Sequence, residues 1–218
     1  MTGARFDTVT MARELYTEGP RLIRTLQHLR PRILPFEMIH DAVPQGARVL
    51  DVGCGGGLVL GLLAKAGRVR EAVGFDSSAD AIAIAQGMTR NLAQGVSLDF
   101  RHLPVNAPWP EGPFDAVMIV DVIHHIPPAA QEAVLAQAAA VLRPGGRMIY
   151  KDMGQRPGWM ALANRLHDLV IARDWIHYLP LERARRAMDG AGLTVRDEQA
   201  ASLLWYRHEM LVADAPAA

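Results

Sequence analysis

The sequence has little cysteine, no long apolar run and no excess of charge of either sign. Cys54 is its one cysteine among 218 residues, so no disulfide can form within the chain, as is usual in a reducing compartment. No stretch approaches the roughly 20 apolar residues of a membrane-spanning helix, and residues 1–13 have no signal-peptide pattern. We therefore expect a protein without a membrane span, located in the cytoplasm.

The charge balance argues against nucleic acid as a partner. Basic and acidic residues number 23 each, whereas a surface that binds phosphates needs a basic surplus. No nucleic acid is therefore expected, although a local basic face stays open. Half of the residues are hydrophobic, which is enough for the core of one compact domain.

Short β-rich segments alternate with helix-like segments from residue 48 to residue 152, after a mainly helical start. The alternation predicts an α/β fold with a doubly wound, mostly parallel sheet. Two further segments near the end are expected to form an antiparallel strand pair at the sheet edge. The expected strands are 48–52, 71–76, 96–102, 116–120, 147–152, 193–200 and 203–212, and the expected helices include 58–66, 78–92, 128–142, 159–178 and 182–191.

We interpret the chain as one domain with four parts. N-terminal helices form a cap over 1–45, and the alternating core covers 46–152. A helical insert after the fifth strand covers 153–182, and a helix with the strand pair completes the chain over 183–218.

The most specific motif is a glycine-rich turn, V-L-D-V-G-C-G-G-G, over residues 49–57. A strand leads into the turn and a helix follows it, and open α/β sheets bind ligands beyond the carboxyl ends of their strands. The dinucleotide fingerprint G-x-G-x-x-G would place its third glycine at Leu58. A carboxylate at Asp51 suits an ammonium group and would repel a pyrophosphate. The spacing therefore disfavours a nicotinamide cofactor.

The run D-x-G-x-G-x-G over residues 51–57 resembles motif I of the class I S-adenosylmethionine-dependent methyltransferases. The resemblance extends to F-D-A-V at 114–117, the histidine pair at 124–125 and L-R-P-G-G at 142–146. It implies a Rossmann-like methyltransferase fold, S-adenosyl-L-methionine as the cofactor and S-adenosyl-L-homocysteine as its product. The implied activity is methyl transfer.

The resemblance also implies roles for single residues in binding the cofactor. In this family the acid and the glycine backbone hold the amino-acid end of the cofactor, which here implicates Asp51, Gly53, Cys54 and Gly55. Cys54 is interpreted as a small turn residue rather than a nucleophile.

An acid also ends the second expected strand, where such folds bind a ribose. A carboxylate can accept hydrogen bonds from both hydroxyls of a diol, so Asp76 is assigned to the ribose. Ser77 would lie against the adenine or cap the next helix. The family's acid at the adenine position is missing, since that position falls near His102 or Leu103. A backbone carbonyl could then accept from the adenine, with Leu103 packed on the ring.

The loop after the fourth expected strand lies beside the reactive methyl group in this family. Val120 and Asp121 are therefore expected to be cofactor neighbours. His125 and His124 are candidate bases because imidazole titrates near neutrality, although such a pair also serves structural packing. A metal is not expected, because no third or fourth ligand accompanies the two histidines.

The family builds its acceptor pocket from the N-terminal helices and the insert. Aromatic and histidine side chains there favour an apolar or aromatic acceptor, although the same side chains could simply pack the insert onto the sheet. Arginines in both parts could receive a carboxylate, a phosphate or the acidic face of a carrier protein, or form an ordinary solvated face. The candidate pocket residues are Tyr16, Trp159, His167, Trp175 and Tyr178.

The function expected from the sequence is methyl transfer to a small molecule, such as a biosynthetic intermediate linked to a carrier or a lipid. Two alternatives stay open. One is an RNA or protein methyltransferase, and the other is a non-catalytic protein that binds S-adenosylmethionine.

Overall fold

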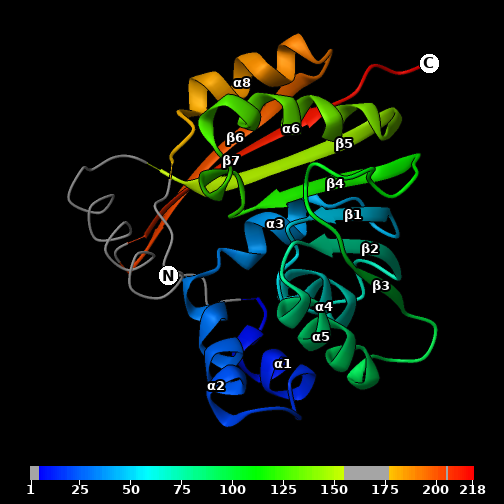
Figure 1. The fold of residues 1–218 in the computed structure, drawn as a ribbon, viewed down its shortest axis with the longest axis vertical. Helices are drawn as coiled ribbons and strands as arrows, with labels where there is room; N and C mark the ends of the chain where they lie inside the picture. The colour runs from blue at the N-terminus through cyan, green and yellow to red at the C-terminus, as the bar shows by residue number, and fades with distance from the viewer. Residues whose placement is uncertain (1–4, 155–176, 205) are drawn as a thin grey trace. The chain divides into compact units, whose positions relative to one another are not determined.

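The computed structural model describes residues 5–154, 177–204 and 206–218 (Figure 1). The chain divides into two compact units, Met1–Pro110 and Glu111–Ala218, which are considered separately below. Among the described helices, none is long and apolar enough to cross a membrane. The four-part division expected from the sequence stays a prediction.

The first unit contains a parallel three-stranded sheet in the order β3-β2-β1. Asp51 in β1 lies opposite Gly74 in β2, which in turn lies opposite Phe100 in β3. The strands are β1 (Arg48–Val52), β2 (Glu71–Asp76) and β3 (Ser97–His102), and the helical elements that follow β1 and β2 are α4 (Leu58–Lys65), α5 (Ala79–Met88) and η2 (Thr89–Asn91).

The N-terminal part of this unit is helical, as the sequence predicts. Asp7 caps the first helix by accepting from the Thr10 N–H at 3.0 Å. The second helix ends at Leu29 and passes directly into a short 3-10 turn. Pro31 has no backbone N–H, so the α-helical hydrogen-bond pattern cannot continue through it. The elements are α1 (Thr8–Leu15), α2 (Arg21–Leu29), η1 (Arg30–Ile33) and α3 (Phe36–Ala42).

The second unit contains strands in the order β4-β5-β7-β6. β4 and β5 are parallel, whereas β7 is antiparallel to both β5 and β6. The antiparallel C-terminal pair expected from the sequence is therefore confirmed. The strands are β4 (Phe114–Val120), β5 (Leu142–Met153), β6 (Thr194–Leu203) and β7 (Tyr206–Asp214), and the helical elements are η3 (Ile123–His125), α6 (Pro128–Ala140) and α8 (Leu181–Gly190).

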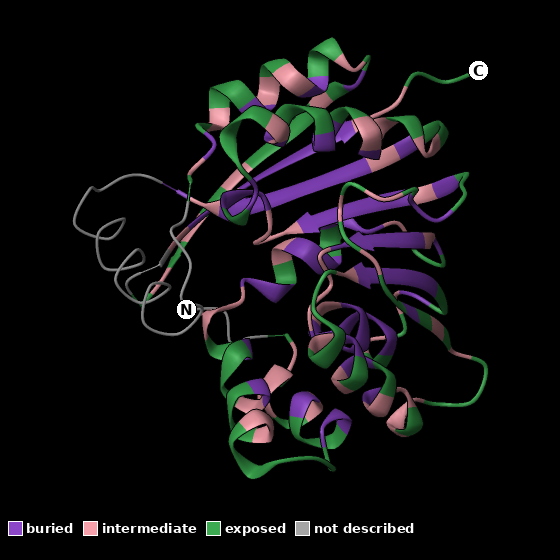
Figure 2. Cartoon of the chain, viewed as in Figure 1, coloured by how far each residue is buried: buried purple, intermediate pink, exposed green. Residues whose placement is uncertain are grey.

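The cores of the two units follow the apolar segments of the sequence (Figure 2). Residues Ala116–Ile119 of β4 are fully buried, as the uninterrupted apolar run predicts for an inner strand. One or two helices were also expected over 159–178, but most of this range falls in 155–176 and lies outside the described residues.

Candidate functional site

The glycine-rich turn connects β1 to α4 in a backbone conformation that residues other than glycine rarely adopt. Gly53, Gly55 and Gly57 have φ angles of 68°, 53° and 78°. A Cβ placed on Gly55 would meet only Arg30 Nη1, at 3.9 Å, whereas a Cβ on Gly57 would lie 2.8 Å from Phe100 Cζ. Gly57 therefore serves close packing, and Gly55 leaves an open face where a ligand can approach the backbone.

Asp51 lies at the carboxyl end of β1 and is 2% exposed. Burial raises the pKa of its carboxyl to about 8, and the like charge of Asp76 adds to this shift. A buried acid with an acidic neighbour is poised to accept a cationic group. Strongly shifted pKa values of this kind are common at functional sites.

Asp76 links the end of β2 to the glycine turn. Its Oδ2 accepts from the Gly55 N–H at 2.9 Å, and its Oδ1 accepts from the Ser78 N–H at 2.9 Å. Each carboxylate oxygen has a further lone pair, so two hydroxyl groups can still be accepted. The structure therefore brings Asp76 together with the turn while leaving acceptor capacity for a diol.

The residues expected near an adenine lie beside Asp76. His102 Nε2 donates to the Ser77 carbonyl at 3.0 Å, and the Leu103 N–H donates to the Asp76 carbonyl at 2.9 Å. Ser77 and His102 are exposed, and Leu103 is half-buried. The N-cap of α5 is Ser78, whose hydroxyl accepts from the Ala81 N–H. The side chain of Ser77 is therefore not the cap of this helix.

Cys54 is held in the turn by backbone contacts. Its N–H donates to the Phe75 carbonyl at 3.0 Å, and its carbonyl accepts from the Gly57 N–H at 2.9 Å. Burial, together with the acids Asp51 and Asp76, raises the pKa of its thiol above the ordinary value. A thiol that resists ionisation is a poor nucleophile, which agrees with a turn residue.

The N-terminal helices supply two side chains to the turn that sequence reasoning missed. Gln27 of α2 is 7% exposed, and its Oε1 has no hydrogen-bond partner among the described residues. Its Nε2 would lie only 2.7 Å from a Cβ on Gly56. Arg30 approaches Gly55 from η1. For Gln27 the available signal was a polar residue between leucines of one helix.

Tyr16 was expected to form a wall of the acceptor pocket. The structure buries its side chain, and its Oη donates to the Gly56 carbonyl at 2.7 Å. This contact makes Tyr16 a support for the glycine turn. Its pKa is raised, because burial disfavours the phenolate.

In the second unit, an ion pair connects the loop after β4 to β5. Lys151 Nζ lies 2.6 Å from both carboxylate oxygens of Asp121. The Lys151 side chain is fully buried, whereas that of Asp121 is 29% exposed. Burial alone would raise the pKa of Asp121, but the charge and hydrogen bonds of Lys151 hold it below the usual value. Asp121 also has a φ of 57°, which is unusual for a residue with a side chain.

The two adjacent histidines have different environments. His124 is buried, and its Nδ1 and backbone N–H both contact the Asp152 carboxylate. His125 is exposed, and its ring centroid lies 4.2 Å from that of His124. Of the two rings, only that of His125 is therefore accessible to a molecule in solution. Asp152 holds the His124 ring, against which the His125 ring packs.

The remaining candidates are less informative. Val120 is half-buried at the end of β4, and Tyr178 is half-buried just before α8. The other pocket candidates, Trp159, His167 and Trp175, lie outside the described residues.

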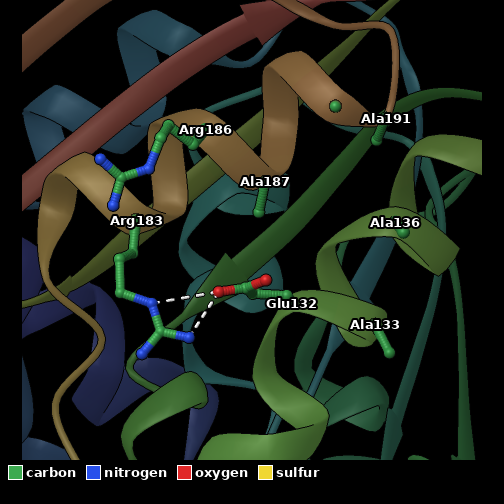
Figure 3. A pocket seen from close by; sticks show the side chains of 8 residues that line it. Glu132, Ala133, Ala136, Arg183, Arg186, Ala187 and Ala191 are labelled. Atoms are coloured by element: carbon green, nitrogen blue, oxygen red, sulfur yellow. Dashed lines mark hydrogen bonds and ion pairs between the residues drawn. The ribbon is translucent and has the colours of Figure 1, made fainter.

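A shallow groove between α6 and α8 contains none of the expected site residues (Figure 3). Arg183 bridges it by donating to Glu132 Oε1 from Nε at 3.1 Å and from Nη2 at 2.5 Å. The groove is otherwise lined mainly by small side chains, which offer little to bind a ligand. Its lining residues are Glu132, Ala133, Ala136, Arg183, Arg186, Ala187, Gly190 and Ala191.

Comparison with known proteins finds relatives that are similar over part of the sequence. The ubiquinone biosynthesis O-methyltransferase of Xanthomonas axonopodis pv. citri (strain 306) is 34% identical over 122 residues, which are 55% of this chain and 48% of that protein. The corresponding protein of Xanthomonas campestris pv. campestris (strain B100) is 32% identical over 148 residues, 67% of this chain and 58% of that protein. The chain therefore spans about half the length of these curated relatives.

Solved structures share the fold at low sequence identity. The magnesium protoporphyrin IX methyltransferase of Synechocystis PCC 6803, solved with bound S-adenosylhomocysteine, has a TM-score of 0.70 and 20% identity, covering 94% of this chain and 93% of its own. This likeness confirms the Rossmann-like methyltransferase fold expected from the sequence.

The family itself follows from a model that describes a methyltransferase domain and matches residues 19–198. Because this match covers most of the sequence, the chain belongs to the methyltransferase-domain family, which confirms the resemblance seen in its motifs.

Proposed function

We propose that the chain transfers the methyl group of S-adenosylmethionine to a small-molecule acceptor of apolar or aromatic character. The observation that carries the proposal is the glycine turn of the first unit. There the buried acid Asp51 and the diol-accepting Asp76 flank Gly55, which has an open face.

The residues of the turn fit the two charges at the amino-acid end of this cofactor. Asp51 would pair with the ammonium group, which relieves the cost of a buried carboxyl beside Asp76. Arg30 lies over Gly55 and would hold the carboxylate. Gln27 Oε1, which is buried without a partner among the described residues, can accept a further hydrogen bond from the ammonium group.

Asp76 would hold the ribose through the lone pairs that Gly55 and Ser78 leave unused. The half-buried Leu103 would pack against the adenine ring, and the neighbouring Ser77 and His102 would border it. Val120 and Asp121 of the second unit stay proposed neighbours of the cofactor. In their case the proposal rests on the family's usual arrangement.

When bound, the cofactor supplies a methyl group already activated by a positive sulfur. The protein then has to align the acceptor and exclude water. We assign removal of the acceptor proton to His125, the exposed member of the pair. His124 and Asp152 would keep its ring in place.

The names of the relatives favour oxygen as the accepting atom. The Xanthomonas proteins are named as O-methyltransferases of ubiquinone biosynthesis, and a base such as His125 suits deprotonation of a hydroxyl group. An acceptor linked to a carrier protein or a lipid, and a location in the cytoplasm, belong to the same proposal. Tyr16 and Tyr178, together with the undescribed Trp159, His167 and Trp175, remain candidates for the acceptor pocket.

The proposal is tested with radiolabelled S-adenosylmethionine and a panel of hydroxylated aromatic acceptors, free and carrier-linked. We expect label in the product with at least one acceptor.

Asp76→Ala should weaken cofactor binding by about 1–3 kcal/mol, because polar contacts are lost. His125→Ala should lower turnover and leave the affinity for S-adenosylhomocysteine intact.

Other outcomes separate the alternatives. Label transferred to RNA or protein, with none to small molecules, would show that the acceptor is a macromolecule and not a small molecule. Tight binding of S-adenosylhomocysteine with no transfer to any of the three classes would identify a non-catalytic binding protein. Full turnover in His125→Ala would remove this residue from the role of base.

A further inference from the structure

In helix α2 the leucines are exposed, whereas Gln27 is buried and Arg24 and His28 are half-buried. The last three side chains make contacts that fix this arrangement. Gln27 packs against Gly56, Arg24 Nη1 donates to the Thr17 carbonyl at 2.7 Å, and His28 Nε2 donates to the Tyr16 carbonyl at 3.0 Å. The helix therefore cannot rotate its apolar face into the core without breaking the contacts that support the glycine turn.

The outward face of α2 is a leucine stripe. Leu22 is 70% exposed, and Leu26 and Leu29 are each 43% exposed. At 3.6 residues per turn these three positions fall within a sector of about 60°. Among the described residues, only four large hydrophobic side chains are strongly exposed, and three of them belong to this stripe. Scattered exposed leucines need no explanation, but a continuous apolar face on one helix does.

The charge around the stripe is positive. Residues 19–36 contain four arginines and no acidic residue, although the whole chain has no net charge. Arg21 begins α2 and Arg32 follows its end, and both are exposed. Arg30 is assigned above to the glycine turn. The leucine stripe therefore lies in a segment with two exposed arginines. The acids that flank this segment contact other residues, since Glu18 pairs with Arg90 at 3.2 Å and Glu37 accepts from the Arg5 N–H.

We propose that the leucine stripe, Leu22, Leu26 and Leu29, docks the protein on an anionic lipid bilayer, with Arg21 and Arg32 at the headgroups. A short helix with leucines on one face and arginines beside them binds in the interfacial plane of a membrane. Basic side chains add attraction to anionic lipids at the surface. The charge complementarity favours such a surface over an apolar protein groove, which would leave both arginines unused.

The proposal does not depend on the proposed function, because docking requires no methyl transfer. The test is co-sedimentation of the whole protein with vesicles of phosphatidylcholine alone or mixed with phosphatidylglycerol. We expect binding to the mixed vesicles at low salt, weaker binding to neutral vesicles, and loss of binding as salt screens the charges.

Two variants separate the apolar and the charged contributions. Leu22→Ser/Leu26→Ser/Leu29→Ser removes the stripe and should lower the partition coefficient about tenfold or more. Arg21→Gln/Arg32→Gln should lower it about tenfold on anionic vesicles and leave the weak binding to neutral vesicles unchanged. Circular dichroism and titration with S-adenosylhomocysteine check that each variant is folded.

Matched controls use exposed residues outside α2. Leu204→Ser removes a leucine that is 65% exposed, and Arg70→Gln/Arg186→Gln removes two exposed arginines. Neither control should change vesicle binding. Failure of the unaltered protein to bind anionic vesicles at low salt, or equal losses in variants and controls, would overturn the proposal. The proposal would also be overturned if the protein did not bind vesicles but formed a dimer that the stripe variant dissociates. The stripe would then join two copies of the chain.

Discussion

Asp51 makes the proposed cofactor site sensitive to pH. Its pKa is raised to about 8 in the free protein, so the carboxyl is largely protonated near neutrality. An ammonium group binds the ionised form, and binding must therefore release a proton. Because ionisation of the free protein proceeds as the pH approaches this pKa, affinity should rise with pH up to about 8 and then level off.

Calorimetric titration with S-adenosylhomocysteine across this range measures the effect. Buffers of different ionisation enthalpy reveal the released proton directly. Asp51→Asn should bind more weakly, with an affinity that depends much less on pH. An unaltered protein whose affinity is constant through neutral pH would contradict the role given to Asp51.

The same carboxyl links stability to pH when the cofactor is absent. The folded protein holds a proton on Asp51 up to about pH 8, whereas the unfolded chain releases it near the ordinary value of an aspartate. The folded state thus binds more protons between these two values, and this group lowers the free energy of unfolding as pH rises between them. Denaturant titrations of the protein and of Asp51→Asn at several pH values should show a smaller decline in the variant.

At the scale of elements, the turn from β1 to α4 depends on Gly57 for two separate reasons. Its φ of 78° disfavours a side chain, and a Cβ would lie 2.8 Å from Phe100 Cζ. Gly67, just after α4, has a similar φ of 69° but nothing within 4 Å of a Cβ. Gly67→Ala should therefore cost only the backbone strain, about 1 kcal/mol.

Gly57→Ala adds a clash between α4 and β3 and should cost about 3 kcal/mol or more. Urea unfolding of the two variants measures the difference. Equal losses would show that Phe100 shifts freely and that Gly57 has no role in close packing.

The ion pair between the loop after β4 and β5 should respond unequally to removal of its two members. Asp121→Asn keeps a residue that tolerates the positive φ but leaves Lys151 fully buried without the acid it contacts. Loss of a partner from a buried pair costs about 3–5 kcal/mol. Lys151→Met leaves behind an acid that is 29% exposed and can be hydrated, so it should cost less. Thermal unfolding of both variants decides the order, and a greater loss in Lys151→Met would contradict this account.

At the scale of the whole molecule, the alternation of strands and helices predicted the fold. The spacing of apolar residues differs between strands and helices, because it depends on which face of the element is buried. The apolar run in β4 and the prolines after α2 are local signals, and the structure follows both. The sequence predicted a mainly helical start, which includes the segment with Leu22, Leu26 and Leu29. It could not show which face turns inward, because that depends on contacts of Gln27 and His28 with distant backbone.

The candidate site divides in the same way. The glycine motif and the strand ends point to Asp51, Gly55 and Asp76 from the sequence alone, and the structure brings the three residues together; their roles toward a cofactor stay predictions. Arg30 reaches the turn from far away in sequence, and no local pattern distinguishes it from the other arginines of its segment. Lys151 was also missed, although a lysine within an apolar strand is itself a signal of a buried acidic partner.

The central claim is that this member of the methyltransferase-domain family uses S-adenosylmethionine. The most direct test is calorimetric titration of the purified protein with S-adenosylhomocysteine, run beside an identical titration with NAD. The account predicts saturable binding of S-adenosylhomocysteine at one site, weakened in Asp76→Ala, and no binding of NAD. A folded protein that binds NAD, or that fails to bind S-adenosylhomocysteine, would contradict it.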